Sequence, residues 1–201
     1  KEFSLLLTLL GQAEFGYHEY PAALQAFNRA VDVVASKKND KAWLGFFHDV
    51  QVWQARTHWQ LKNEGNHRQA AISIFERILK ENEHHVACLA YYSCVAIDCG
   101  QSKECIPYLL RALVDAAQKN PGSSQPVGLG GEKKKKGNPL EQDTMNLIKR
   151  KLVEVVSETG GLSALISDLH DASNNAPALT FLAQTLKDQG AIAESCALYE
   201  R

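Results

Sequence analysis

The sequence contains few residues that interrupt helices and no long apolar run. Only six of its 201 residues are proline, and alternating runs of Val, Ile and Thr are missing. Because proline breaks helices most strongly and alternation is the main signal of a strand, this scarcity favours an all-α chain. No segment reaches the roughly 20 consecutive apolar residues that a membrane helix needs, so we expect no membrane insertion.

An excess of charge of either sign is also missing. The chain has 22 Lys and Arg against 23 Asp and Glu, a formal net charge of −1. Binding to nucleic acid depends on an excess of Lys and Arg that neutralises phosphates. We therefore expect no nucleic-acid partner.

Motifs of known catalytic chemistry are missing as well. The sequence has no Gly-x-Ser-x-Gly, no phosphate-binding Gly-rich loop after a strand and no His-Glu-x-x-His. These motifs bring a nucleophile, backbone N–H donors or metal ligands to one place, and the seven histidines here are scattered. We expect neither enzyme activity nor a cofactor.

Cysteine is present in an odd number without a recognisable framework. Cys-x2-Cys spacing, typical of zinc sites, does not occur. A zinc site with His84 and His85 is one interpretation; buried small thiols are the one that we favour. An odd count without a disulfide framework indicates a reducing compartment, the cytoplasm with the nucleus as the alternative. The five cysteines are Cys88, Cys94, Cys99, Cys105 and Cys196.

The most informative stretch, His84 to Leu113, predicts two helices folded back on each other. Apolar residues recur at the i, i+3, i+4 spacing of one helix face before and after Asp98-Cys99-Gly100-Gln101. Gly100 lies where a helix C-terminus favours a residue with positive φ. The stretch therefore predicts an αα-hairpin.

This hairpin recurs along the chain. Leu89–Leu113 aligns with Leu179–Arg201, which places Gly100 over Gly190, and Leu7–Val31 fits the same pattern. A fourth copy has a clear second helix, in which Ala71 lies 34 residues before Cys105. A period of 34 residues is that of tetratricopeptide repeats.

On these residues the chain resembles the tetratricopeptide repeat superfamily. Its second-helix pattern of small, aromatic and small residues is matched fully by Ala23, Phe27 and Ala30, and with substitutions by two further triplets. The resemblance implies a right-handed superhelix of αα-hairpins, a solenoid, over about three quarters of the chain. The substituted triplets are Ala71, Phe75 and Ile78, and Cys105, Leu109 and Ala112.

The pattern divides the chain into four parts. Residues 1–118 hold three hairpins, the second with a lengthened first helix, and residues 172–201 hold a further hairpin that stops within its second helix. Between them, residues 119–140 read as a disordered loop rich in Gly, Pro and Lys, and residues 141–171 as a degenerate hairpin. The run Lys133–Lys136 predicts a solvated insertion, with a nuclear-import signal as the alternative. We expect a piece of a longer repeat protein.

The helix expected at 42–61 is unusually aromatic. One interpretation is that its aromatic side chains fill an enlarged junction between the first two hairpins. The other is that Trp53 or Trp59 projects into the groove and binds a peptide, since aromatic residues dominate binding hot spots. The aromatic residues are Trp43, Phe46, Phe47, Trp53 and Trp59.

The resemblance implies a scaffold that docks a protein or peptide in its concave groove, which the first helix of each hairpin lines. Chaperone-binding members carry a clamp of Lys, Asn and Arg, but the corresponding residues here are Thr8, Gln12, Ala87 and Tyr91, which argues against Hsp70 or Hsp90 tails. The alternative is a structural role in supporting an adjacent domain or self-association. The groove candidates are Thr8, Gln12, Trp53, Gln54, Trp59, Asp98, Thr180, Gln184, Lys187 and Asp188.

Overall fold

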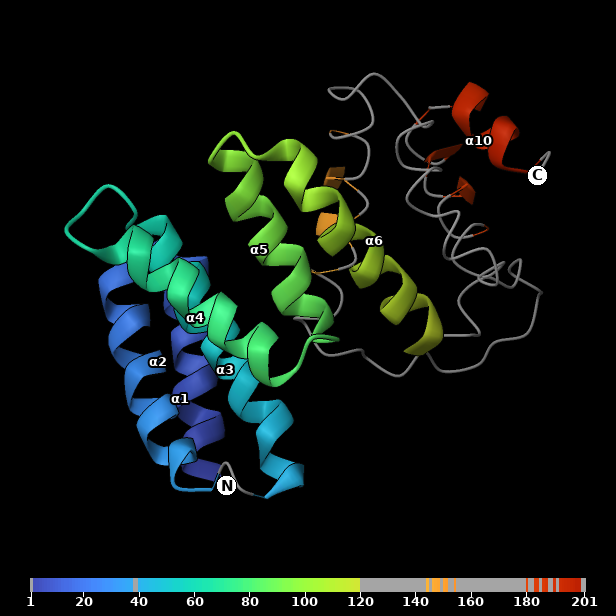
Figure 1. Cartoon of the computed structure of the whole chain (residues 1–201). Helices are drawn as coiled ribbons and strands as arrows, with labels where there is room; N and C mark the ends of the chain where they lie inside the picture. Colours follow the sequence, from blue (N-terminus) through green and yellow to red (C-terminus); the bar gives the residue numbers. More distant parts are fainter. Residues whose placement is uncertain are drawn as a thin grey trace. The chain divides into compact units, whose positions relative to one another are not determined.

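The chain is all-α throughout the part described by its computed structural model. That part holds helices and turns and no strand, as the sequence predicts (Figure 1). It comprises residues 2–37 and 40–119, followed by isolated positions and short stretches. These are residues 144, 146–148, 150–151, 154, 180, 183–184, 186–187, 190 and 192–199.

The chain divides into two compact units, residues 1–83 and residues 84–201. The first unit contains four helices that pack in chain order, each against the next (Figure 1). They are α1 (Glu2–Gly16), α2 (Tyr20–Ala35), α3 (Lys41–Gln60) and α4 (His67–Glu81). Two αα-hairpins, α1–α2 and α3–α4, are thus joined through the contact between α2 and α3.

The core of the first hairpin is built from α2 and one face of α1. Pro21 lies in the first turn of α2, where its missing N–H costs nothing. Ala23, Phe27 and Ala30 follow at helical spacing and are fully buried. Gly11 of α1 lies against the Phe27 ring, so close that a Cβ there would come within 2.7 Å of Cε1.

The equivalent positions of the other second helices are buried in the same way. In α4 these are Ala71, Phe75 and Ile78, and all three have no exposed surface. In α6 (Ser102–Lys119) they are Cys105, Leu109 and Ala112, of which Leu109 is 1% exposed and the other two are fully buried. The spacing that carries the family resemblance is therefore the spacing of the core contacts.

The second unit repeats the hairpin in α5 (Val86–Asp98) and α6, which pack against each other. Gly100 between them has φ +78°, the left-handed conformation that its sequence position predicts. Tyr92 and Tyr108 meet across the hairpin edge to face, with ring centroids 5.4 Å apart.

A further helix, α10 (Ile192–Tyr199), follows Gly190, whose φ is +84°. The hydroxyl of Ser195 donates to the carbonyl of Ala183 at 2.8 Å, and both residues are buried. The loop expected at 119–140 falls, after Lys119, outside the described residues. So do most of residues 141–171, together with Lys133–Lys136 and Asp188.

Candidate interaction surfaces

The groove candidates of the first unit are largely engaged within the fold. Thr8 is buried, and its hydroxyl donates to the carbonyl of Ser4 at 2.8 Å. The side-chain amide of Gln54 donates to Oδ1 of Asn28 at 2.8 Å and links α3 to α2. Gln12 is half-buried. These three side chains are therefore less accessible to a partner than their positions on the first helix of a hairpin predict.

Trp53 and Trp59 are core residues, with exposed fractions of 6% and 9%. The Trp53 ring stacks on Phe27 with a centroid distance of 5.9 Å and meets Phe15 edge to face at 5.5 Å. The guanidinium of Arg56 lies 3.8 Å from the Trp53 ring centroid. This placement matches the junction-filling interpretation of the aromatic helix, because Trp53 lies between the first two hairpins.

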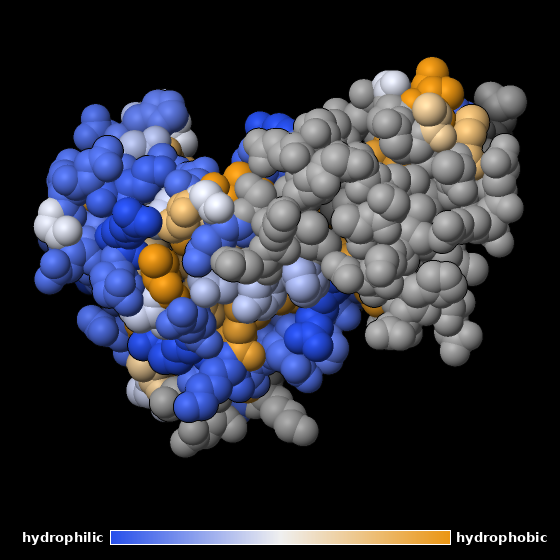
Figure 2. Space-filling view, turned by 45° about the horizontal axis from the view of Figure 1, so that its top comes forward, coloured by the Kyte–Doolittle hydropathy of each residue, from blue (hydrophilic) through white to orange (hydrophobic). Residues whose placement is uncertain are grey.

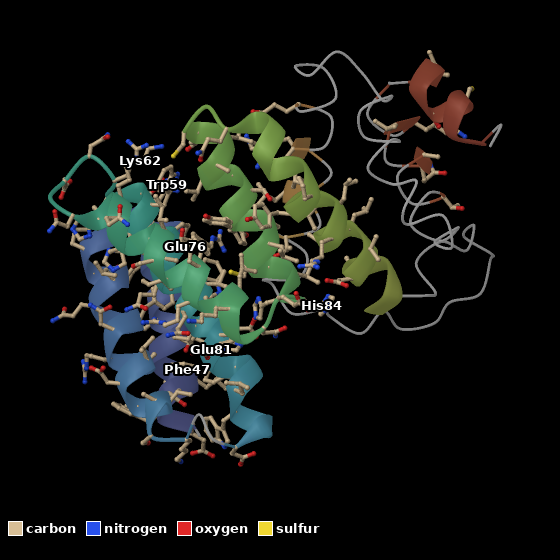
Figure 3. The ribbon with its side chains drawn as sticks, in the orientation of Figure 1. Phe47, Trp59, Lys62, Glu76, Glu81 and His84 are labelled. Atoms are coloured by element: carbon tan, nitrogen blue, oxygen red, sulfur yellow. The ribbon has the colours of Figure 1, made fainter. Side chains whose placement is uncertain are left out.

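Trp59 lies near the end of α3, where the chain turns into α4 (Figure 3). The ammonium of Lys62 is 4.5 Å from the centroid of its ring. Because only 9% of Trp59 is exposed and Lys62 lies over its ring, Trp59 has little surface that a peptide could contact.

The groove candidates of the second unit have a different placement. Asp98, Thr180, Gln184 and Lys187 are all exposed, on α5 and on the helical positions before α10. Ala87, one of the places compared with the chaperone clamp, is buried, and Tyr91 is half-buried. The exposed polar candidates therefore lie in this unit. Neither Ala87 nor Tyr91 has the positive charge of the Lys or Arg in the chaperone clamp.

Of the eight exposed large apolar side chains among the described residues, five lie on α1. These five side chains are about half exposed or more, whereas Ser4, Leu7, Thr8 and Gly11 of the same helix are buried. We call the five exposed side chains the α1 surface; its residues are Phe3 (55%), Leu5 (49%), Leu6 (63%), Leu9 (50%) and Leu10 (50%). By contrast, the face seen in Figure 2 is mostly hydrophilic over its coloured part, with apolar residues scattered among polar ones.

The α1 surface was not among the candidates taken from the sequence. Leu7 and Leu10 both lie in the stretch Leu7–Val31 that fits the hairpin pattern, but Leu7 is 5% exposed and Leu10 is 50% exposed. A signal was present in Ser4-Leu5-Leu6-Leu7-Thr8-Leu9-Leu10, where the leucines spread over roughly half of the circumference of a helix or more. A helix that packs on one side cannot bury them all, so some must face outward.

Histidine side chains form close pairs at three places. Nδ1 of His58 lies 2.7 Å from Nδ1 of His67 across the α3–α4 turn. Burial and the neighbouring His67 lower the pKa of His58 below its ordinary value. Nε2 of His48 lies 3.1 Å from Oε2 of Glu81, and Nδ1 of His84 lies 3.1 Å from Oδ2 of Asp115.

The cysteines are thiols whose reactivity the fold suppresses to different degrees. Burial raises the pKa of Cys88, and burial also raises that of Cys94 to about 12. Cys105 is buried, Cys99 is half-buried and Cys196 is exposed. Within the described part of the chain, no three His, Cys, Asp or Glu side chains converge on a point that could hold a metal ion.

Comparison with protein-family models and with curated proteins gave no match. Among the helices that the structure describes, none combines the length and apolar character required to span a membrane. The geometry of the helices and the α1 surface are therefore the basis for assigning a function.

Proposed function

We propose that the chain is a non-catalytic protein–protein interaction module, a tetratricopeptide-like array of αα-hairpins that docks a protein segment. The observation that carries this proposal is the α1 surface. Large apolar patches that are exposed on a protein surface mark sites of interaction, because water is a poor solvent for them.

The physical argument is the cost of leaving these side chains in water. Fully burying one Leu or Phe side chain contributes about 1.5–3 kcal/mol. The α1 surface comprises five such residues about half exposed or more, whereas Leu7 on the same helix is buried. A partner that covers the surface gains this free energy without any change in the hairpin beneath it.

The exposed polar residues of the second unit form a second part of the proposed binding function. Thr180, Gln184 and Lys187 are exposed, at positions that correspond in the repeat pattern to the first helix of a hairpin. Groove docking at these residues depends on hydrogen bonds and charge, whereas docking on α1 depends on apolar contact. The two modes therefore respond to different substitutions.

The test is a capture experiment with three versions of the chain, in which bound proteins are identified by mass spectrometry. The versions are wild type, Leu6→Glu with Leu9→Glu, and Gln184→Ala with Lys187→Glu. A protein captured by wild type and lost with the first variant supports docking on α1. Loss with the second variant supports the groove instead.

The alternative function is structural support of a neighbouring domain, or self-association. It predicts that all three versions capture the same proteins. Self-association is measured separately by sedimentation at increasing concentration, where the Leu6→Glu, Leu9→Glu variant remains monomeric if the α1 surface joins two copies. Equal capture by all versions would contradict the binding proposal.

A further inference from the structure

Two histidine side chains from different helices face each other at the α3–α4 turn. His58 lies in the last turn of α3, and His67 is the first residue of α4. Their Nδ1 atoms are 2.7 Å apart and their ring centroids 4.9 Å apart. This is the end of the α3–α4 hairpin near which Trp59 and Lys62 are labelled in Figure 3. The fold thus pairs two imidazoles that the turn separates in the sequence.

This pair differs in chemistry from the other two close histidine pairs. Each of those joins an imidazole to a carboxylate, Glu81 or Asp115. In a neutral imidazole one ring nitrogen carries a proton and the other carries a lone pair, so between the Nδ1 atoms of His58 and His67 one ring donates and the other accepts. Neutral imidazole is also the commonest metal ligand in proteins. The pair therefore brings two candidate ligands from two helices within reach of one ion.

The distance between the two nitrogens fits neighbouring positions around a single ion. Two metal–nitrogen bonds of about 2.0–2.1 Å place the nitrogens roughly 2.9 Å apart at a right angle and roughly 3.3 Å apart at the tetrahedral angle. From 2.7 Å the pair must open by about 0.2 Å in the first case and about 0.6 Å in the second. Right angles occur in square-planar and octahedral sites, which suit Ni²⁺ and Cu²⁺, whereas Zn²⁺ favours tetrahedral sites.

The rings must also turn to share an ion. In the hydrogen bond each Nδ1 points toward the other ring, whereas in a metal site both point at the ion. The χ2 angle of histidine has broad minima, which permit this rotation. The Nδ1 proton of one ring moves to its Nε2 through solvent, which reaches both half-buried rings, so no proton leaves the neutral pair.

The backbone on both sides of the pair is held by the fold. Trp59, next to His58, is 9% exposed, and the N–H of His67 donates to the carbonyl of Glu64 at 3.3 Å. The charged residues of the turn, residues 61–66, are Lys62 and Glu64, so the turn has no net charge that repels a cation.

We propose that His58 and His67 form a binding site for a divalent late first-row transition-metal ion of the Ni²⁺ or Cu²⁺ class, with water at its remaining positions. The site is a further property of the chain and does not depend on docking at the α1 surface. With two protein ligands it binds its ion reversibly, in contrast to the closed four-ligand sites of structural zinc. A bound ion joins the end of α3 to the start of α4.

The probe is Ni²⁺ alone, titrated into the whole chain and followed by calorimetry. All versions carry Cys196→Ser, so that the exposed thiol does not compete for the ion. His58→Gln and His67→Gln should each weaken Ni²⁺ binding by about tenfold or more. The matched control is His84→Gln, which changes a histidine with a 60% exposed side chain and should leave binding unchanged. Zn²⁺ should bind more weakly than Ni²⁺.

A second measurement tests whether the ion joins the two helices. Ni²⁺ well above its Kd should raise the urea midpoint, because an ligand that binds the folded chain more tightly than the unfolded chain stabilises the fold. His67→Gln should abolish this rise, whereas His84→Gln should retain it. Circular dichroism of each variant establishes that its fold is retained.

The inference is overturned if Ni²⁺ does not bind the Cys196→Ser chain, or if it binds this chain and both glutamine variants of the pair with equal affinity. An equal loss with His84→Gln would place the ion elsewhere and have the same consequence. Zn²⁺ bound more tightly than Ni²⁺ would contradict the right-angle geometry from which the class of ion is inferred.

Discussion

Gly11 of α1 lies so close to Phe27 of α2 that any side chain at position 11 would collide with the Phe27 ring. A Cβ on Gly11 would lie 2.7 Å from Cε1 of Phe27, and the Phe27 ring is fully buried. The ring is also stacked on Trp53 of the next hairpin. One glycine thus lets the aromatic residue of α2 contact both neighbouring helices.

Gly11→Ala should destabilise the chain although alanine favours helices. The added methyl overpacks a site that Phe27 and Trp53 prevent from relaxing, at a cost of about 1–3 kcal/mol that outweighs the gain of about 1 kcal/mol in helix propensity. Urea unfolding measures the difference. The control is Gly45→Ala in α3, where no atom lies within 4 Å of an added Cβ, and it should be neutral or stabilising. Equal effects of the two variants would contradict the Gly11–Phe27 contact.

Neighbouring leucines on α1 should differ sharply in their contribution to stability. Leu7→Ala removes a side chain that is 5% exposed and should cost about 2–5 kcal/mol. Leu6→Ala changes a side chain that is 63% exposed and should cost less than about 0.5 kcal/mol in the free chain. Thermal unfolding of the two variants is the measurement. Similar losses at the two positions would place Leu6 in the core and remove the α1 surface.

The burial of His58, together with its close contact with His67, should make the free energy of unfolding fall on acidification. The pKa of His58 is below 6.5 in the folded chain, so the unfolded chain takes up its proton first as the pH falls. This difference in proton uptake has no effect on the free energy of unfolding well above pH 6.5. It lowers that free energy increasingly as the pH falls from 6.5 toward the pKa of His58 in the folded chain. Two protonated rings would also leave no acceptor between nitrogens 2.7 Å apart.

The measurement is the urea midpoint of wild type and His58→Gln between pH 7.5 and pH 5. Wild type should lose more stability over this range than the variant, because glutamine does not titrate. The pH dependence of the two proteins would be the same if burial of His58 and its contact with His67 had no effect on folding.

The cysteines should react with a thiol reagent in an order set by their burial. Cys196 is exposed and should be labelled first, whereas Cys88 and Cys94, whose pKa values burial raises, should react slowly at pH 7.5. Mass spectrometry of timed aliquots identifies the labelled peptide. In urea all five cysteines should react at similar rates. Early labelling of Cys88 in the folded chain would contradict its placement.

The hairpin core could be predicted from the sequence because its signal is local. Ala23, Phe27 and Ala30 lie on one face of a single helix, and Gly100 is a turn residue whose conformation depends on its neighbours in the chain. Such signals come from the spacing of residues within one helix or turn.

The location of the exposed surfaces could not be predicted in this way. The spacing of Leu5, Leu6, Leu9 and Leu10 does not reveal that one side of α1 lacks a neighbour, and the spacing of Trp53 does not reveal that Phe27 covers it. Burial of these side chains depends on contacts between helices distant in sequence. The structure supplies these contacts, and with them the α1 surface.

The most direct test of the central claim is a methyl NMR titration of the whole chain with a protein that wild type captures and the Leu6→Glu, Leu9→Glu variant does not. If the α1 surface is the docking site, the methyl signals of Leu5, Leu6, Leu9 and Leu10 shift on binding, and those of the buried Leu109 and Leu113 remain in place. Shifts confined to residues outside α1, or no shift with the captured protein at saturation, would contradict the claim.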